Sequence, residues 1–150
     1  LNRAVASFAR LTLDRNIRPG ARTQIARDQA EGATLVLATA AHELYAAPIA
    51  RELGFDAVVA TRMLPREDGR IGPELDGGNV YGEAKLAALL RFRVCCHDGE
   101  LGAPIAFYSD SSSDRPVFDW ADRAVAVNPS RRLRRLAARR GWAIEDWGRP

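Results

Sequence analysis

The chain has 150 residues, of which 47% are hydrophobic and 27% charged, with a formal net charge of +3. These values fit one globular domain with a core of ordinary size. No apolar run is long enough to span a bilayer, and the opening residues contain no signal-peptide-like apolar segment, so we expect a cytoplasmic protein.

Hydrophobic periodicity predicts an alternation of helices and strands in the first half of the chain. The expected elements are a helix over 2–13, a helix over 19–31, a buried parallel strand over 33–39, a helix over 40–53 and a strand over 56–61. Gly32 and Gly54 are expected to end the helices before them, and Pro48 to kink or divide its helix. Helix followed by buried strand is typical of an α/β protein.

The second half continues the alternation. The expected elements are a small β-hairpin within 62–75, a helix over 82–91, a buried strand over 105–108, a helix over 115–120, a strand over 123–127 and a helix over 130–140. Glu67-Asp68-Gly69-Arg70 is the turn signal of the hairpin, and residues 91–102 read as polar and irregular.

Two residues of these predicted elements, Thr39 and Lys85, are candidates for binding phosphate. Thr39 places a hydroxyl at the predicted end of the first strand, although a threonine there commonly caps the next helix. Lys85 is the single lysine of the chain and stands in the first turn of a predicted helix, where cations are disfavoured. The alternative for Lys85 is a solvated surface side chain.

The strongest pair is Asp110 and Asp114, which follow the strand over 105–108. Two carboxylates this close require a cation or a basic group, and hard cations such as magnesium prefer such oxygens. The alternative is a turn in which an aspartate caps the following helix. A hydroxyl, a lysine and paired carboxylates at successive strand ends are what a phosphoryl-transfer site requires.

Three segments with these residues resemble the haloacid dehalogenase superfamily, and within it the phosphoserine-phosphatase-like hydrolases of subfamily IB. The segments are LVLATAAHELYAAPIARELGFDAVVAT, DGRIGPELDGGNVYGEAKLAAL and FYSDSSSDRPVFDWADRAVAVNPSRRLRRLAARRGW. The resemblance extends from Arg18 to about Trp147. It implies a Rossmann-like three-layer α/β/α sandwich with a mainly parallel sheet.

The resemblance also implies a function and a set of roles. The function is Mg²⁺-dependent hydrolysis of a small phosphorylated metabolite through an aspartyl-phosphate. Thr39 matches the phosphate-binding hydroxyl and Lys85 the lysine that neutralises the phosphate. Asp110 matches the aspartate that binds the metal, and Asp114 the second carboxylate that supports it.

The sequence departs from the family pattern in two places. Ser109 replaces the usual glycine before Asp110, which is expected to tighten the loop. The first motif, DxDxT, which carries the nucleophile on the central strand, is absent, so we expect that strand before residue 1 and no turnover by this chain alone. Residues 1–17 are expected to be the last helix of the cap, and residues 18–150 the core. The resemblance implies that this strand lies between the strands over 33–39 and 105–108, so without it these two inner strands would each have an unpaired edge.

Alternatives from other classes remain. The chain could be a non-catalytic phosphate- or nucleotide-binding module, or a basic nucleic-acid-binding protein that uses the arginines of the last helix: Arg131, Arg132, Arg134, Arg135, Arg139 and Arg140. We favour a solvated helix with Leu133 and Leu136 packed inward, and nucleic acid is not expected as a partner.

His42 could touch substrate, but a solvent-facing position is favoured. Adjacent Cys95 and Cys96 are expected to be reduced thiols.

Overall fold

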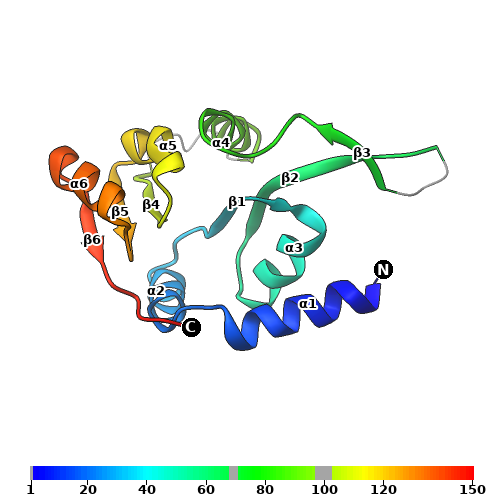
Figure 1. Ribbon diagram of the computed structural model, residues 1–150, viewed down its shortest axis with the longest axis horizontal. Helices are drawn as coiled ribbons and strands as arrows, with labels where there is room; N and C mark the ends of the chain where they lie inside the picture. The colour runs from blue at the N-terminus through cyan, green and yellow to red at the C-terminus, as the bar shows by residue number, and fades with distance from the viewer. Residues whose placement is uncertain (1, 68–70, 97–102) are drawn as a thin grey trace. The chain divides into compact units, whose positions relative to one another are not determined.

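The computed structural model of the chain describes residues 2–67, 71–96 and 103–150. Helices and strands alternate through these ranges (Figure 1). In chain order the elements are α1 (Asn2–Arg15), α2 (Pro19–Ala30), β1 (Val36–His42), α3 (Glu43–Glu52), β2 (Ala57–Pro65), β3 (Ile71–Asp76), α4 (Glu83–Cys96), β4 (Ala106–Ser109), the 3₁₀ turn η1 (Ser112–Asp114), α5 (Arg115–Trp120), β5 (Arg123–Val127), α6 (Arg131–Arg140) and β6 (Ala143–Glu145). The predicted α/β class is confirmed.

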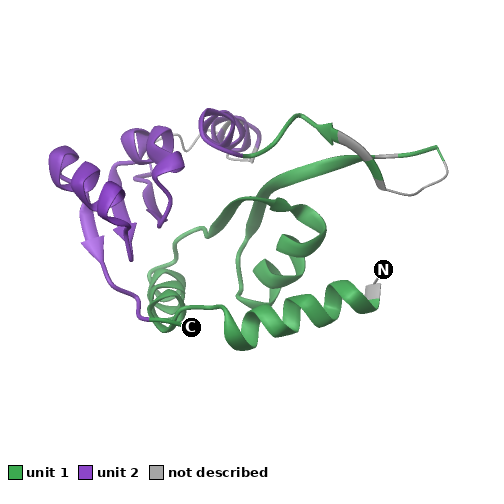
Figure 2. Ribbon diagram, in the orientation of Figure 1, with its two compact units in different colours: residues 1–80, 149–150 green, residues 81–148 purple. Residues whose placement is uncertain are grey.

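The chain forms two compact units (Figure 2). Unit 1 comprises residues 1–80 and 149–150, and unit 2 comprises residues 81–148. α1 and α2 both belong to unit 1, so the expected boundary at residue 17 does not coincide with the division between the units. The assignment of residues 1–17 to a cap stays a prediction.

Unit 1 is built on a three-stranded sheet in the order β1-β2-β3. β1 and β2 run parallel, from the pair Val36 and Ala57 to the pair Thr39 and Ala60. The far end of β2 pairs with β3 in the antiparallel direction, which confirms the predicted hairpin. Its predicted turn falls largely on residues 68–70, outside the described residues.

The predicted bounds and burial of the first strand are wrong in detail. β1 begins at Val36, later than expected, and continues to His42. Its residues are half-buried to exposed and not fully buried, because β2 is the one strand that pairs with β1 among the described residues. Pro48 was expected to kink or divide its helix; it lies inside α3 without dividing it, and the kink stays a prediction. Gly54 follows α3 with φ +75°, a left-handed conformation that glycine adopts without strain.

Unit 2 contains a parallel sheet in the order β4-β5-β6. β5 is its central strand, and Ala124 to Val127 on it are all buried. The core against this strand includes Phe118 from α5 and Leu133 from α6. Trp142 stacks on Phe118 with the ring centroids 4.6 Å apart. This packing fixes α5 and α6 on the sheet that carries the candidate carboxylates.

The parallel pairs β1–β2 and β4–β5 begin with the same kind of hydrogen bond. The backbone N–H of Leu35 donates to Asp56 Oδ2 at 2.7 Å, and that of Ile105 donates to Asp122 Oδ2 at 2.7 Å. In each pair, the aspartate just before the second strand therefore binds the backbone just before the first strand. This contact fixes the register of both pairs.

Three features of unit 2 differ from expectation. α4 continues to Cys96, so the expected irregular segment is helical over 91–96, and residues 97–102 lie outside the described part of the chain. β4 is half-buried, with Ala106 exposed, where a buried strand was expected. β6 was not predicted at all. The last helix agrees with prediction, since Ser130 accepts a hydrogen bond from the N–H of Leu133 and Gly141 ends α6 with φ +72°.

Each sheet ends in a strand that has a single neighbour. In the described residues β1 pairs only with β2, and β4 pairs only with β5. These are the two strands expected to lose a partner if the central strand of the family is missing.

Every described helix is too short or too polar to cross a bilayer.

Candidate active site

A buried ion pair forms the centre of the site in unit 2. Lys85 stands in the first turn of α4 and is 7% exposed. Its Nζ lies 2.6 Å from Oδ1 of Asp114, a residue that is 3% exposed. The alternative of a solvated surface lysine is therefore wrong. A charged pair removed from water to this degree needs close compensation of both charges, which the short contact provides.

Asp114 is held through its second oxygen as well. The hydroxyl of Ser109, at the end of β4, donates a hydrogen bond of 2.7 Å to Oδ2 of Asp114. Asp114 immediately precedes α5, but its side chain makes no capping hydrogen bond to that helix. The alternative in which this carboxylate serves as a helix cap is also wrong. Both carboxylate oxygens are directed to side chains of the site.

The loop between β4 and α5 is ordered by its serines. The N–H of Ser111 donates to the Ser109 hydroxyl at 3.1 Å, and the N–H of Ser113 donates to the Ser111 hydroxyl at 3.3 Å. The hydroxyls of Ser111 and Ser113 are themselves 2.7 Å apart. Sequence reasoning named Ser109 only as a departure from the family pattern, and it missed the hydrogen bonds of Ser111 and Ser113. The run SDSSSD was the available signal, because serine hydroxyls readily bond nearby backbone N–H groups.

Asp110 differs from Asp114 in its surroundings. It is the first residue after β4 and is exposed to solvent. The carboxyl ends of parallel strands are where open α/β sheets bind ligands. Asp110 is therefore the carboxylate of the pair that a ligand or cation can reach from solvent.

The donor set fits one side of a magnesium site. Asp110 is exposed and has the hard carboxylate oxygens that Mg²⁺ prefers. The oxygens of Asp114 contact Lys85 and Ser109. Within the described ranges no group of three or more His, Cys, Asp or Glu side chains could hold a metal ion. A complete magnesium shell would therefore need further oxygen ligands.

Thr39 lies within β1 in unit 1, opposite Ala60, whereas the other three predicted site residues belong to unit 2. It is half-buried, and its hydroxyl accepts a hydrogen bond of 3.0 Å from the N–H of Ala41. The register of β1 is irregular between Thr39 and His42. Thr39 does not cap α3, because His42 occupies that position. Because the Thr39 hydroxyl oxygen acts as an acceptor in this hydrogen bond, its proton can still be donated to another group.

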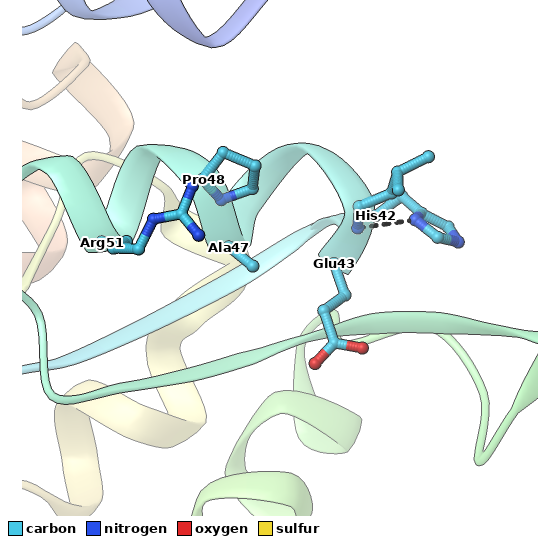
Figure 3. Close-up of a pocket in the computed structure, with 6 residues that line it drawn as sticks. His42, Glu43, Ala47, Pro48 and Arg51 are labelled. Atoms are coloured by element: carbon cyan, nitrogen blue, oxygen red, sulfur yellow. Dashed lines mark hydrogen bonds between the residues drawn. The ribbon is translucent and has the colours of Figure 1, made fainter. Parts of the chain in front are cut away.

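His42 caps α3 with its Nδ1, which accepts a hydrogen bond of 3.0 Å from the N–H of Leu44 (Figure 3). Its Nε2 is buried and has no hydrogen-bond partner among the described residues. The favoured expectation of a solvent-facing His42 is therefore wrong. An open hollow at the start of α3 is lined by His42, Glu43, Leu44, Ala47, Pro48 and Arg51.

The arginine-rich α6 packs as the solvated-helix interpretation expects. Leu133 is fully buried and Leu136 is partly buried against the core, while the arginines of the helix are exposed. Arg140 forms an ion pair of 3.2 Å with Asp119 of α5. Cys95, near the end of α4, is a free and exposed thiol.

Helices together with parallel strand pairs define this chain as an α/β protein, with the polar residues Ser109 and Asp110 at the carboxyl end of β4. The haloacid dehalogenase-like hydrolase family matches residues 1–119, so the chain belongs to that family. The resemblance drawn from the three sequence motifs is confirmed.

Curated relatives agree with this assignment. A Streptomyces azureus protein named for inhibition of morphological differentiation is 41% identical over 103 residues, which are 69% of this chain and 36% of that protein. A probable phosphatase of Mycobacterium tuberculosis is 36% identical over 79% of this chain and 40% of its own length. A phosphoserine phosphatase of the same organism is 36% identical over 83% of this chain and 39% of its own length. The chain thus spans well under half of these relatives.

Solved structures support the fold. A Bordetella pertussis protein of unknown function aligns with a TM-score of 0.80 and 28% identity, covering 97% of this chain and 67% of that one. A substrate-bound phosphoserine phosphatase aligns with a TM-score of 0.64 and 18% identity, covering 88% of this chain and 59% of that one. At this identity the second likeness concerns the fold alone.

Proposed function

We propose that this chain is part of a magnesium-dependent phosphomonoesterase of the haloacid dehalogenase type, which acts through an aspartyl-phosphate. The observation that carries the proposal is the Lys85–Asp114 pair, with 2.6 Å between Nζ and Oδ1 and side chains only 9% and 4% exposed. A lysine held in this way brings a fixed positive charge close to the strand ends where a phosphate would be bound.

Each predicted residue has a role in this proposal. Lys85 neutralises charge on the phosphoryl oxygens, and Asp114 holds the ammonium in place. Thr39 donates its hydroxyl proton to a phosphoryl oxygen, which the acceptor role of its Oγ1 toward Ala41 leaves possible. Fixed donors and charges of this kind act where negative charge develops in the transition state.

Asp110 is the residue proposed to bind magnesium, with Asp114 supporting the site through Lys85. The ion, when bound, supplies positive charge that polarises the phosphoryl group. Exposed carboxylate oxygens after β4 support this role for Asp110.

The attacking carboxylate is assigned to a segment outside these 150 residues, because no DxDxT motif occurs in them. In the proposed reaction that carboxylate forms a bond to phosphorus while the bond from phosphorus to the ester oxygen breaks, and the leaving alcohol takes up a proton. Water then cleaves the aspartyl-phosphate to inorganic phosphate. A small phosphorylated metabolite is the proposed substrate.

The test compares the full-length protein encoded by the gene with the 150-residue chain, using p-nitrophenyl phosphate and added magnesium. We expect hydrolysis by the full-length protein, at least about 100-fold less in Asp110→Asn and Lys85→Met, and none by the 150-residue chain. Arg62→Ala, which removes an exposed partner of Glu43 in unit 1, is the control and should keep full activity. Hydrolysis that survives Asp110→Asn would refute the proposal.

The missing motif also supports a second candidate, a phosphate-binding module without catalytic activity. It predicts a full gene that lacks DxDxT and a protein that binds inorganic phosphate with magnesium yet hydrolyses no ester. Sequencing upstream of residue 1 separates the two candidates directly.

A further inference from the structure

The residue at the end of β4 has a contact that the family pattern does not provide. Where that pattern has glycine, this chain has Ser109, whose hydroxyl lies 2.7 Å from Oδ2 of Asp114. We propose that Ser109 is a positioning residue, which orients the carboxylate of Asp114 and through it the ammonium of Lys85. Its catalytic meaning rests on the proposed function, but the contact itself can be tested without activity.

The two hydrogen bonds of the Ser109 hydroxyl determine where its proton points. A hydroxyl has one proton to donate, and the N–H of Ser111 already approaches its oxygen as a donor at 3.1 Å. An ionised carboxylate can only accept, so the hydroxyl proton points to Asp114. Hydrogen bonds from a hydroxyl to a carboxylate are short and stronger than those between neutral groups. The distance of 2.7 Å fits such a bond.

Two anchors on different oxygens fix the carboxylate of Asp114. Ser109 binds Oδ2, while Lys85 lies 2.6 Å from Oδ1. Asp114 is 3% exposed, so water cannot readily replace either contact. Without the Ser109 hydroxyl, the buried Oδ2 would lack its donor, and the carboxylate could turn and draw the ammonium with it.

This arrangement separates the roles of the two aspartates. Asp114 has both oxygens directed to protein groups, so it acts through Lys85, whereas Asp110 stays exposed after β4. Glycine at position 109 has no side chain and could not make this contact. Ser109 therefore adds a fixed orientation to a pair that would otherwise depend on one ion-pair contact.

The test uses the fact that Lys85 is the only lysine. Reductive methylation of the 150-residue chain with formaldehyde and cyanoborohydride modifies two amines, Lys85 and the α-amine, and peptide mass spectrometry gives their relative rates. We expect Ser109→Ala to raise the rate of Lys85 relative to the α-amine about tenfold, from loss of a hydrogen bond to a charged group. Ser109→Thr, which keeps the hydroxyl, should return the ratio to within about twofold of wild type.

Two controls separate positioning from general loosening. Ser112→Ala removes a neighbouring hydroxyl that takes part in none of the side-chain hydrogen bonds of the loop among the described residues, and should leave the ratio unchanged. Val117→Ala removes two methyl groups from a fully buried residue of α5 that is not a member of the pair, and it destabilises unit 2. If Val117→Ala raised the Lys85 rate as much as Ser109→Ala, the positioning role would be refuted. If Ser109→Ala does not fold, Ser109→Gly, the residue of the family pattern, carries the same comparison.

An activity measurement distinguishes this inference from the proposed function. In the full-length protein, Ser109→Ala should lower kcat/KM for p-nitrophenyl phosphate about tenfold, and Ser109→Thr should restore it. Changed labelling in a protein that never hydrolyses phosphate esters would support the role of Ser109 and refute the phosphatase proposal. Unchanged labelling in Ser109→Ala would refute the role of Ser109, whatever the activity.

Discussion

Replacing Lys85 with methionine should destabilise unit 2 far more than loss of a surface ion pair would. The variant leaves Asp114 buried with a charge that, among the described residues, the Ser109 hydroxyl alone still contacts. Removing one partner of a buried pair costs about 3–5 kcal/mol of unfolding free energy. The contact distance of 2.6 Å and the side-chain exposures of 9% and 4% place this pair in that class.

A second ion pair in the same chain provides the comparison. Arg62 and Glu43 in unit 1 lie 2.9 Å apart, but their side chains are 57% and 37% exposed. Water screens such a pair, so Arg62→Met should cost at most about 1 kcal/mol. The two pairs have similar contact distances, and burial is the main difference between them.

Urea unfolding followed by tryptophan fluorescence is a suitable assay, because all three tryptophans lie in unit 2. Circular dichroism follows Arg62→Met, since unit 1 has no tryptophan. The double variant Lys85→Met/Asp114→Val should recover most of the loss, because an apolar pair of similar volume often replaces a buried ion pair without cost. A loss below about 1 kcal/mol in Lys85→Met would contradict the reasoning.

Other residues give further predictions. Leu133→Ala should cost about 2–5 kcal/mol in the same unfolding assay, because Leu133 is fully buried beneath α6, and a smaller loss would place it outside the core. Gly141→Ala should cost about 1 kcal/mol, because φ at this position is +72°, and an unchanged midpoint would contradict the strain. Arg131→Gln/Arg135→Gln should change stability by less than about 0.5 kcal/mol, since both side chains are exposed. Salt-dependent RNA binding that this double variant abolishes would instead favour the nucleic-acid alternative.

Local patterns predicted the elements whose signals lie within a few residues. Ser130 before α6 and Gly141 after it have the capping roles that their positions indicated. α5 and β5 have the predicted bounds. The sequence also predicted that Lys85 lies in the first turn of a helix and that Asp110 and Asp114 follow a strand. Each of these positions depends on residues close by in the sequence.

Features that depend on distant parts of the chain could not be predicted in this way. β6 contains only Ala143–Glu145 and exists because it pairs with β5, an interaction that no local pattern reveals. β1 and β4 are as apolar as buried strands, but their burial depends on which segments cover them. The bond from Ser109 to Asp114 joins a strand end to a helix start, and a serine in a serine-rich turn gives no sign of which carboxylate it binds.

The single neighbour of β1 and of β4 has a consequence for amide hydrogen exchange. Successive N–H groups of a strand point to opposite sides, so in a strand with one neighbour only every second amide is hydrogen-bonded within the sheet. Residues 36–39 of β1 and 106–109 of β4 should therefore show slow and fast exchange in alternation. In β5, between β4 and β6, exchange should be slow at consecutive residues. If another strand pairs with β1 or β4 in the full-length protein, the fast amides of that strand should become slow.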